Sequence, residues 1–566
     1  MISQAKVHIN VCPGHVLNNY NNLIRKRSMG KYLIISILLV LVGCKTDSKT
    51  EQAIVEISQA TIGRHIERLA SDEFMGRKPF TEGEVKTVAY LEEEFAKLGL
   101  LPGNGESFFQ DVPMVEITAV PEDKMKISGP EGDLELEYLK DFALVAEKIE
   151  PGNVLENSEL VFAGFGIVAP EYGWNDYEGI DWKGKTAVVL INDPGFKSGD
   201  STLFKGNEMT YYGRWTYKYE EAARQGADGV LIIHDTEPAS YGWNVVQSSW
   251  RGGQLNIEST NPVADINAWI SNESANKIFK ASSYKGEDYK KIAGLKGFKP
   301  IPLGLTASVK VANTLKRDVS KNVVAILPGT ERKDEYIIYS AHWDHFGIGI
   351  PVEGDSIYNG ALDNASGTAC LLAIAEAFKK STPTKRSIVF MAVTGEEQGL
   401  LGSAYYAENP IYEPMKTVAN INMDGVMSPG RMKDLTITGF GHSEMDEYGK
   451  AAAQKQGRYV IPDPEAEKGY FFRSDHFNFA RIGIPALYAG GSYEHFEKGV
   501  AYAKQMNDEY LKYKYHQPSD EYDPTTVDLS GAQFDAQLYY NVGLQLANED
   551  YFPKWYDGSE FKAARE

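Results

Sequence analysis

The sequence predicts an α/β fold, in which a mixed central β-sheet is flanked by helices. Short apolar runs typical of buried strands occupy residues 336–341, 386–393 and 418–423. Stretches with helical spacing of apolar residues lie between such runs, for example at residues 368–378. The chain has no internal repeat with a period of about 20 to 50 residues, which argues against solenoids and propellers.

The N-terminal half departs from this alternation. Two amphipathic helical patterns, at residues 54–70 and 85–98, open the folded part. From residue 141 to residue 302, strand-like runs dominate, and no His and carboxylate residues are spaced as a metal site. We therefore expect an insert at residues 141–302, which divides the main domain into residues 53–140 and 303–566.

The composition is that of a globular protein with an acidic surface. Hydrophobic residues make up 43% of the 566 residues, which is enough for more than one hydrophobic core. The 78 Asp and Glu residues outnumber the 58 Lys and Arg residues, so that the formal net charge is -20. Such a surplus of negative charge disfavours nucleic acid as a partner.

The N-terminus has the charge and hydropathy pattern of an export signal. Basic residues at 25–31 precede an apolar run at 32–42, which is too short to remain as a membrane-spanning helix. The run ends in Leu-Val-Gly-Cys at Cys44, which resembles the bacterial lipobox. The resemblance implies that residues 1–43 are removed, that Cys44 is lipidated, and that residues 44–52 tether an exported protein to the bacterial cell envelope. The alternative is a chance apolar segment that ends in Gly-Cys.

Polar residues with metal-binding chemistry stand where the predicted strands end or where the following helix begins. Because open α/β sheets place their chemistry at the carboxyl ends of the strands, we expect these residues to meet at one edge. Adjacent glutamates at a strand end repel each other unless a positive charge lies beside them. The alternatives are solvated surface glutamates and a polar strand end without a function. The residues are His342, Asp344, Asp363, Glu396, Glu397, Asp424 and His516.

The chemistry of these residues indicates two divalent ions. Two imidazoles and three carboxylates are five N and O ligands, which suit two ions that share one bridging carboxylate, and zinc is the leading candidate for this mixture. Glu396 is then left over as the general base. His342 and Asp344 point to the same side of a strand, so that the carboxylate is able to orient the imidazole.

Six motifs follow one another along residues 340–523: SAHWDH, ALDNASGTA, TGEEQGLLGS, NMDG, RSDHFNFARIGIPAL and YHQPSDEYD. In this order they resemble the co-catalytic zinc aminopeptidase family, which also includes glutamate carboxypeptidases and the transferrin receptor. The resemblance covers about residues 55–140 and 305–545 and implies two zinc ions per chain. It implies these roles: His342 and Asp424 on one zinc, Glu397 and His516 on the other, Asp363 as the bridge, Glu396 as the base and Asp344 as the orienting carboxylate.

The insert carries a second resemblance. Its stretch VFAGFGIVAPEYGWNDYEGIDWKGKTAVVLINDPG, at residues 161–195, resembles the protease-associated domain that such peptidases often contain. The resemblance implies a mainly-β insert that acts as a lid or as a substrate-selecting wall. A passive insert without a role in catalysis is the alternative.

The family resemblance implies a metallo-aminopeptidase that removes N-terminal residues from peptide substrates. A carboxypeptidase or another amide hydrolase is the first alternative, because the metal ligands are shared and only the pocket differs. A non-catalytic binding protein on the same fold is the second. Tyr515 is a candidate hydrogen-bond donor to the oxyanion, or else a packed aromatic residue. Further candidates for the pocket, or for the core, are His345, His476, Phe471, Phe472 and Phe477.

Replacing Cys44 by Ser is expected to abolish acyl attachment and to leave a folded catalytic unit, because Cys44 is the only Cys in a lipobox context. Palmitate labelling and membrane fractionation of wild type and Cys44→Ser check this expectation. Equal labelling of the two proteins would contradict it.

Overall fold

The computed structural model describes residues 55–566 of the chain. The predicted leader, the lipid-bearing Cys44 and the tether lie outside the described residues. Helices and strands alternate along the described part, which confirms the predicted α/β fold. Among the helices of this part, none combines the length and the apolar composition needed to cross a membrane.

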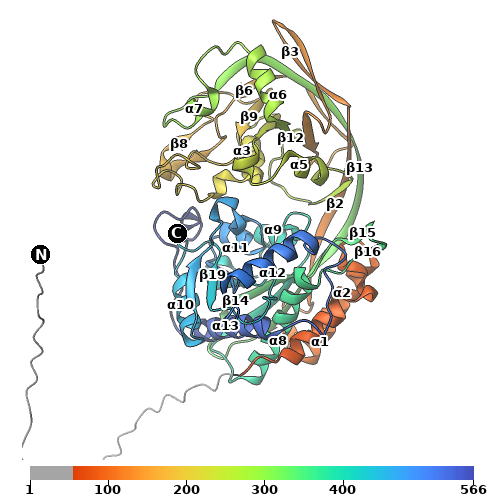
Figure 1. The fold of residues 1–566 in the computed structure, drawn as a ribbon, viewed down its shortest axis with the longest axis vertical. Helices are drawn as coiled ribbons and strands as arrows, with labels where there is room; N and C mark the ends of the chain where they lie inside the picture. Colours follow the sequence, from red (N-terminus) through yellow and green to blue (C-terminus); the bar gives the residue numbers. More distant parts are fainter. Residues whose placement is uncertain (1–54) are drawn as a thin grey trace, which may run out of the picture. The chain divides into compact units, whose positions relative to one another are not determined.

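A mixed sheet forms the centre of the main domain (Figure 1). Strand β14 (Arg332–His342) runs parallel to β17 (Arg386–Val393) on one side and to β18 (Thr417–Asn422) on the other. Beyond these, β18 is parallel to β21 (Ala486–Gly490), and β17 is antiparallel to the last residues of β13 (Ile301–Leu327). Because the inner strands are parallel, their carboxyl ends meet at one edge of the sheet.

Helices pack on both faces of this sheet because side chains alternate along each strand. Tyr339 and Ala341 enter a cluster that contains α8 (Gly367–Lys380) and α13 (Ser530–Asn548). Ile338 enters a different cluster, with side chains of α9 (Leu401–Glu408) and α11 (His476–Arg481). The other elements of the main domain are α1 (Gln59–Leu69), α2 (Glu82–Lys97), β15 (Gly347–Val352), β16 (Asp355–Tyr358), β19 (Asp434–Ile437), α10 (Met445–Lys455), β20 (Tyr459–Pro462) and α12 (Gly499–Tyr513).

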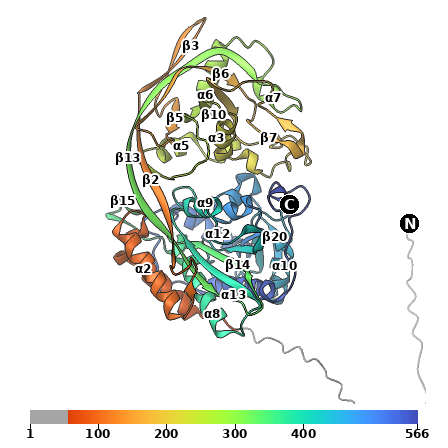
Figure 2. The same ribbon diagram turned by 180° about the vertical axis from the view of Figure 1, so that it is seen from behind.

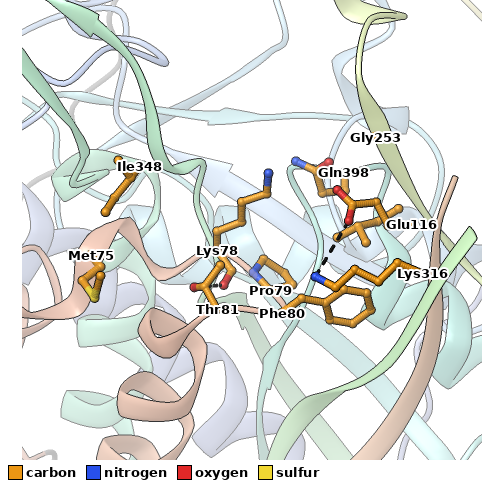
Figure 3. A pocket seen from close by; sticks show the side chains of 11 residues that line it. Met75, Lys78, Pro79, Phe80, Thr81, Glu116, Gly253, Lys316, Ile348 and Gln398 are labelled. Carbon is orange, nitrogen blue, oxygen red and sulfur yellow. Dashed lines mark hydrogen bonds and ion pairs between the residues drawn. The ribbon is translucent and has the colours of Figure 1, made fainter. Parts of the chain in front are cut away.

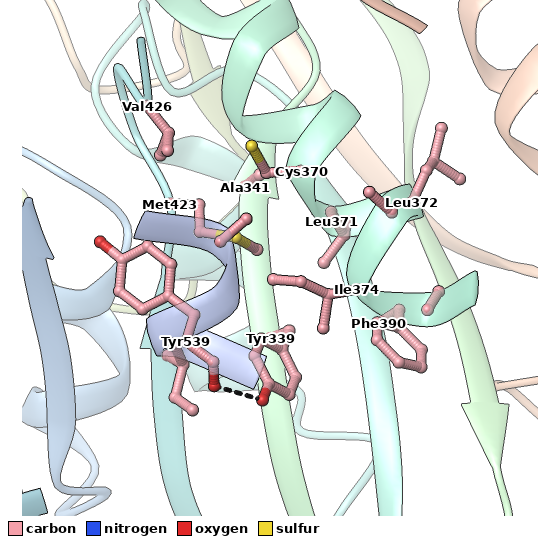
Figure 4. Close-up of a cluster of buried hydrophobic side chains, with 14 of the residues drawn as sticks. Tyr339, Ala341, Cys370, Leu371, Leu372, Ile374, Phe390, Met423, Val426 and Tyr539 are labelled. Atoms are coloured by element: carbon pink, nitrogen blue, oxygen red, sulfur yellow. Dashed lines mark hydrogen bonds between the residues drawn. The ribbon is translucent and has the colours of Figure 1, made fainter. Parts of the chain in front are cut away.

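Figure 4 shows how α8 and α13 are attached to the sheet. The Tyr339 hydroxyl donates a hydrogen bond of 2.8 Å to the backbone oxygen of Tyr539, which satisfies a polar group inside an apolar layer. Ile374 and Cys370 of α8 are fully buried, and the Cys370 thiol is free. Burial raises the pKa of this thiol, so Cys370 acts as a small apolar side chain of the core.

The predicted insert contains four parallel strands joined in the order β6–β9–β10–β12. Parallel neighbours need long crossovers and cannot be joined by tight hairpins, and helices at Trp215–Arg224 and Trp243–Ser249 lie in the connections after β9 and β10. The mainly-β insert stays a prediction. The elements are β5 (Phe142–Val145), β6 (Gly152–Phe162), β9 (Lys185–Leu190), α3 (Trp215–Arg224), β10 (Gly229–His234), α5 (Trp243–Ser249), β11 (Gly253–Ile257), β12 (Ile266–Ser271), α6 (Asn272–Ala281) and α7 (Tyr289–Ala293).

A long antiparallel ladder connects the insert to the main domain (Figure 2). Strand β13 pairs with β6 near its start, with β2 (Phe109–Pro121) along its middle and with β17 at its end. Two large hydrophobic clusters therefore lie along one ladder. One cluster takes side chains from the main domain, and the other takes side chains between Val115 and Val311. The predicted domain boundaries at residues 141 and 302 stay a prediction.

Buried Arg77 connects the N-terminal segment to the loops that follow β14. Its guanidinium donates to the backbone oxygens of Trp343 at 2.9 Å, Leu69 at 2.7 Å, Asn359 at 2.6 Å and Gly360 at 2.9 Å. Desolvation lowers the Arg77 pKa to about 10, so the group stays charged at neutral pH. Each of these oxygens would lack this partner without the guanidinium, which makes Arg77 a structural cation.

The variant Arg77→Met is expected to lower the free energy of unfolding by about 3 kcal/mol, because it leaves buried carbonyl groups without partners. The matched control is Arg68→Met, which removes an exposed ion pair with Glu73 and is expected to cost at most about 0.5 kcal/mol. Urea unfolding of both variants measures the difference. Similar losses in the two variants would contradict the role given to Arg77.

Candidate metal centre

The strand ends deliver the predicted ligands to one edge of the sheet. His342 is the last residue of β14 and pairs in register with Val393, the last residue of β17. Glu396 follows β17 by three residues, and Asp424 follows the end of β18 by two residues. The parallel register of the three strands therefore brings together side chains that are far apart in the sequence.

A separate loop supplies Asp363 from the side. Residues 361–366 form an irregular turn before α8, and the carboxylate of Asp520 accepts hydrogen bonds of 3.1 Å from the backbone N–H groups of Leu362 and Asp363. Asp520 lies in the same polar loop as His516. One loop thus holds the turn in place and also contributes a ligand.

The first group of potential metal ligands surrounds the imidazole of His342. Its Nε2 atom lies 3.3 Å from Asp363 Oδ1, 3.3 Å from Asp424 Oδ1 and 3.8 Å from Glu396 Oε2. One ligand atom each from His342, Glu396 and Asp424 lies within 4.8 Å of the others. This spacing suits donors that surround one cation.

The second group surrounds the other oxygen of Asp363. His516 Nε2 lies 3.3 Å from Asp363 Oδ2 and 3.3 Å from Glu397 Oε2. His345, Asp363 and Glu397 also place one ligand atom each within 4.8 Å of the others. Asp363 therefore turns one oxygen toward each group, which is the arrangement of a carboxylate that bridges two ions.

The electrostatics of the centre favour bound cations. The side chains of Glu396 and Glu397 are only 10% and 4% exposed. Burial, together with the neighbouring carboxylates, raises the pKa of both glutamates well above the ordinary value. Burial lowers the pKa of His342, but the charges of Glu396 and Asp424 outweigh this effect and raise it. Buried carboxylates this close need positive charge beside them to stay ionised.

The donor set fits two divalent ions. The Nε2 atom of His516 is buried and makes no hydrogen bond among the described residues, although it faces two carboxylate oxygens. This nitrogen faces the carboxylate oxygens without hydrogen-bond geometry. Such an arrangement is expected when the nitrogen and the oxygens are ligands of the same metal ion. Imidazole and carboxylate are donors that zinc prefers in proteins.

Asp344 holds the backbone of the predicted base. Its carboxylate is fully buried and accepts a hydrogen bond of 3.1 Å from the backbone N–H of Glu396. Its Oδ1 lies 3.8 Å from His342 Nδ1, beyond hydrogen-bond distance, and the nearer acceptor is the backbone oxygen of Asp344 at 3.3 Å. The Asp344 carboxylate therefore holds the backbone of Glu396. The contact of Asp344 with His342 is made by its backbone oxygen.

Tyr515 lies beside the second group. Its ring stacks on the His516 ring, with centroids 3.7 Å apart and an interplanar angle of 26°. Although 43% of Tyr515 is exposed, partial desolvation of its hydroxyl and the charges of Asp363 and Glu397 raise the pKa of the phenol. The hydroxyl therefore stays protonated and remains a hydrogen-bond donor near the carboxylates.

Two further residues lie at the centre: His345, which the sequence offered as a candidate pocket residue, and Asp475, which was assigned no role. His345 Nδ1 lies 2.5 Å from Glu397 Oε1, and the other ring nitrogen of His345 is buried without a hydrogen-bond partner in the described part of the chain. Asp475 is fully buried and accepts a hydrogen bond of 2.6 Å from the Ser403 hydroxyl. The signal for His345 was its position three residues after His342, while Asp475 had no distinguishing spacing.

The aromatic candidates for a specificity pocket lie in the core. Phe471, Phe472 and Phe477 are buried in a cluster with Met209 of the insert and Phe561 near the C-terminus. Of the two predicted roles, pocket or core, these three rings therefore have the core position. These rings attach the insert to the main domain.

Part of the chain is similar to known proteins. Residues 322–540 match the family model described as peptidase family M28. The mouse protein named aminopeptidase NAALADL1 is 37% identical over 137 residues, which are 23% of this chain and 17% of that protein. A probable zinc metalloprotease of Pyrenophora teres f. teres is 41% identical over 105 residues, or 18% of this chain and 22% of that protein. The chain thus spans about a fifth of the length of these curated relatives.

A solved structure, the aminopeptidase from Aneurinibacillus sp. strain AM-1, is 20% identical. It covers 88% of this chain and is itself covered to 96%, with a TM-score of 0.47.

Removal of divalent ions is expected to lower the midpoint of thermal unfolding at neutral pH, because Asp363, Glu396, Glu397 and Asp424 then repel one another without compensation. A ligand that binds only the folded state stabilises it, by about 2.7 kcal/mol at a free concentration of 100 times Kd. Unfolding is followed by circular dichroism with chelator, and again after zinc is restored. Identical midpoints would argue against a metal centre at this place.

Proposed function

We propose that the protein is a zinc-dependent exopeptidase that removes N-terminal residues from peptides, and the match of residues 322–540 to the model of peptidase family M28 supports this proposal. The observation that carries the proposal is Asp363, which turns one oxygen toward His342 and the other toward His516. This arrangement leaves Glu396 beside the centre without a necessary role as a ligand.

In this proposal, His342, Asp424 and Asp363 hold one zinc ion, while His516, Glu397 and Asp363 hold the other. Bound zinc would supply positive charge that lowers the pKa of a water molecule and polarises the peptide carbonyl group. All five ligands come from strand ends or from loops anchored by backbone hydrogen bonds. The ligand atoms are therefore positioned before substrate arrives.

Glu396 moves the proton. Its backbone is fixed by Asp344, and burial in a group of acidic neighbours raises its pKa. With cations beside it Glu396 would be ionised, and as a carboxylate it accepts a proton from the attacking water molecule. It then donates this proton to the nitrogen of the leaving peptide. Tyr515 donates a hydrogen bond to the oxyanion that forms on the former carbonyl oxygen.

The site of action is a second part of the proposal. We propose that the protein is exported and is attached to the cell envelope through a lipid on Cys44. The support is the order of basic residues, apolar run and Gly-Cys in the sequence. The labelling of Cys44→Ser described above tests this part separately from catalysis.

A panel of substrates tests the activity. Aminoacyl 4-nitroanilides with a free α-amine are compared with the same compounds after N-acetylation and with N-blocked dipeptides. Hydrolysis of the free-amine compounds alone supports an aminopeptidase. Hydrolysis of the N-blocked dipeptides alone would support a carboxypeptidase, and the absence of any turnover in zinc-loaded protein would favour a binding protein.

Replacing Glu396 is expected to lower the rate alone, whereas replacing Glu397 is expected to lower both the rate and the zinc content. Glu396→Gln keeps the size of the side chain but cannot accept a proton, so both ions stay bound while the rate falls on the order of 100- to 10,000-fold. Glu397→Ala removes a ligand, so the zinc content falls as well as the rate.

Elemental analysis and turnover are measured on the same preparations of both variants. Full activity of Glu396→Gln would overturn the assignment of the base. Loss of zinc from Glu396→Gln, with Glu397→Ala still fully loaded, would reverse the two roles.

A further inference from the structure

A cavity of about 380 Å³ contains none of the candidate metal ligands in its lining (Figure 3). Its lining includes Gln398, which directly follows Glu397, and Ile348, which is three residues after His345. His345 and Glu397 are in contact. Two segments of the lining therefore continue directly from residues of the second group.

Six segments that are distant in sequence build this cavity. The loop before α2 contributes Lys78 and Phe80, β2 and β13 contribute Glu116 and Lys316, and β11 of the predicted insert contributes Leu255. The loop is held firmly, because the Phe80 N–H donates a hydrogen bond of 2.6 Å to the carboxylate of Glu84. The lining positions are thus fixed by the fold.

The cavity offers unused positive charge. Lys316 lies 4.0 Å from the carboxylate of Glu116 and 5.5 Å from the centre of the Phe80 ring, so its charge is partly compensated. Lys78 is half-buried, and no carboxylate of the described chain lies within ion-pair distance of its ammonium group. In a protein with a net charge of -20, a cation without an acidic neighbour is able to bind an external anion.

A second donor lines the same cavity as Lys78. The side-chain amide of Gln398 makes no hydrogen bond to another described residue, and both side chains are drawn at the cavity in Figure 3. An ammonium and an amide NH₂ on one side of a cavity form a pair of donors that suits a carboxylate. Glu116 is the only acidic residue of the lining.

We propose that this cavity binds a carboxylate on the leaving side of a short peptide, with Lys78 and Gln398 as donors. The inference rests on the proposed exopeptidase function. The cationic cavity attracts the carboxylate at the far end of a peptide whose N-terminal bond lies at the metal centre. This attraction orients a short peptide along its length. Lys78 is a specificity-determining residue of the substrate site.

Peptides that differ only in this carboxylate test the proposal. With Xaa as the residue that the anilide panel shows to be preferred, the probes are Xaa-Ala, Xaa-Ala-Ala, their C-terminal amides, and Xaa-Glu-amide. The last probe carries its carboxylate on the side chain, so it distinguishes the two sources of this group. The wild type is expected to prefer the free acids or Xaa-Glu-amide over the neutral amides by about tenfold in kcat/KM, mostly through KM.

Variants then assign the preference to the cavity. Lys78→Met is expected to reduce the ratio of acid to amide about tenfold, and Lys78→Arg to retain part of it. Glu116→Gln removes the only acid of the lining and is expected to raise the ratio. The matched control is Lys86→Met, which removes an α2 lysine paired with Glu82 outside the cavity and is expected to keep the wild-type ratio.

Calorimetric binding of the same peptides to the Glu396→Gln protein gives a readout that does not depend on turnover. Tighter binding of the acids that is lost in Glu396→Gln combined with Lys78→Met supports the proposal. Equal affinity for acids and amides, or an equal loss for both in Lys78→Met, would overturn it. Failure of the exopeptidase proposal shows separately, as an absence of turnover with every probe.

Discussion

The repulsion among buried carboxylates at one edge of the sheet is the constraint on which the rest of the structure depends. Asp363, Glu396, Glu397 and Asp424 converge there, and Asp344 lies fully buried behind them. Such a group is costly unless cations compensate it and unless the backbone holds each residue in place. Bound cations and the scaffold would therefore both stabilise this group of carboxylates.

The scaffold resists this repulsion through hydrogen bonds from the backbone. Arg77 binds carbonyl groups of the loops after β14, and Asp520 binds the N–H groups beside Asp363. Asp344 does the same for Glu396. These contacts fix backbone positions, so that side chains of like charge stay near one another and are ready to bind ions.

The insert approaches the centre from two sides. Met209 and Tyr211 pack against the aromatic cluster around Phe477, where the Tyr211 and Phe477 rings are 5.1 Å apart. On the other side, β11 pairs with β2 and contributes Leu255 to the cavity next to Gln398. The predicted insert therefore contacts the main domain through both segments, while its role as a wall for substrate or as a passive insert stays a prediction.

The sequence by itself determined the α/β fold and the residue types of the centre, because parallel strands with apolar runs place the residues that follow them at one edge. This rule was sufficient for His342, Glu396, Glu397 and Asp424, which stand at or just after strand ends. His516 and Asp363 followed from their motifs. Only the tertiary structure decided which oxygen of Asp363 faces which histidine, that Asp520 supports the turn, and that Lys78 and Gln398 share a cavity. Most of these contacts join segments more than 150 residues apart. Whether such segments meet depends on packing, which leaves no local pattern in the sequence.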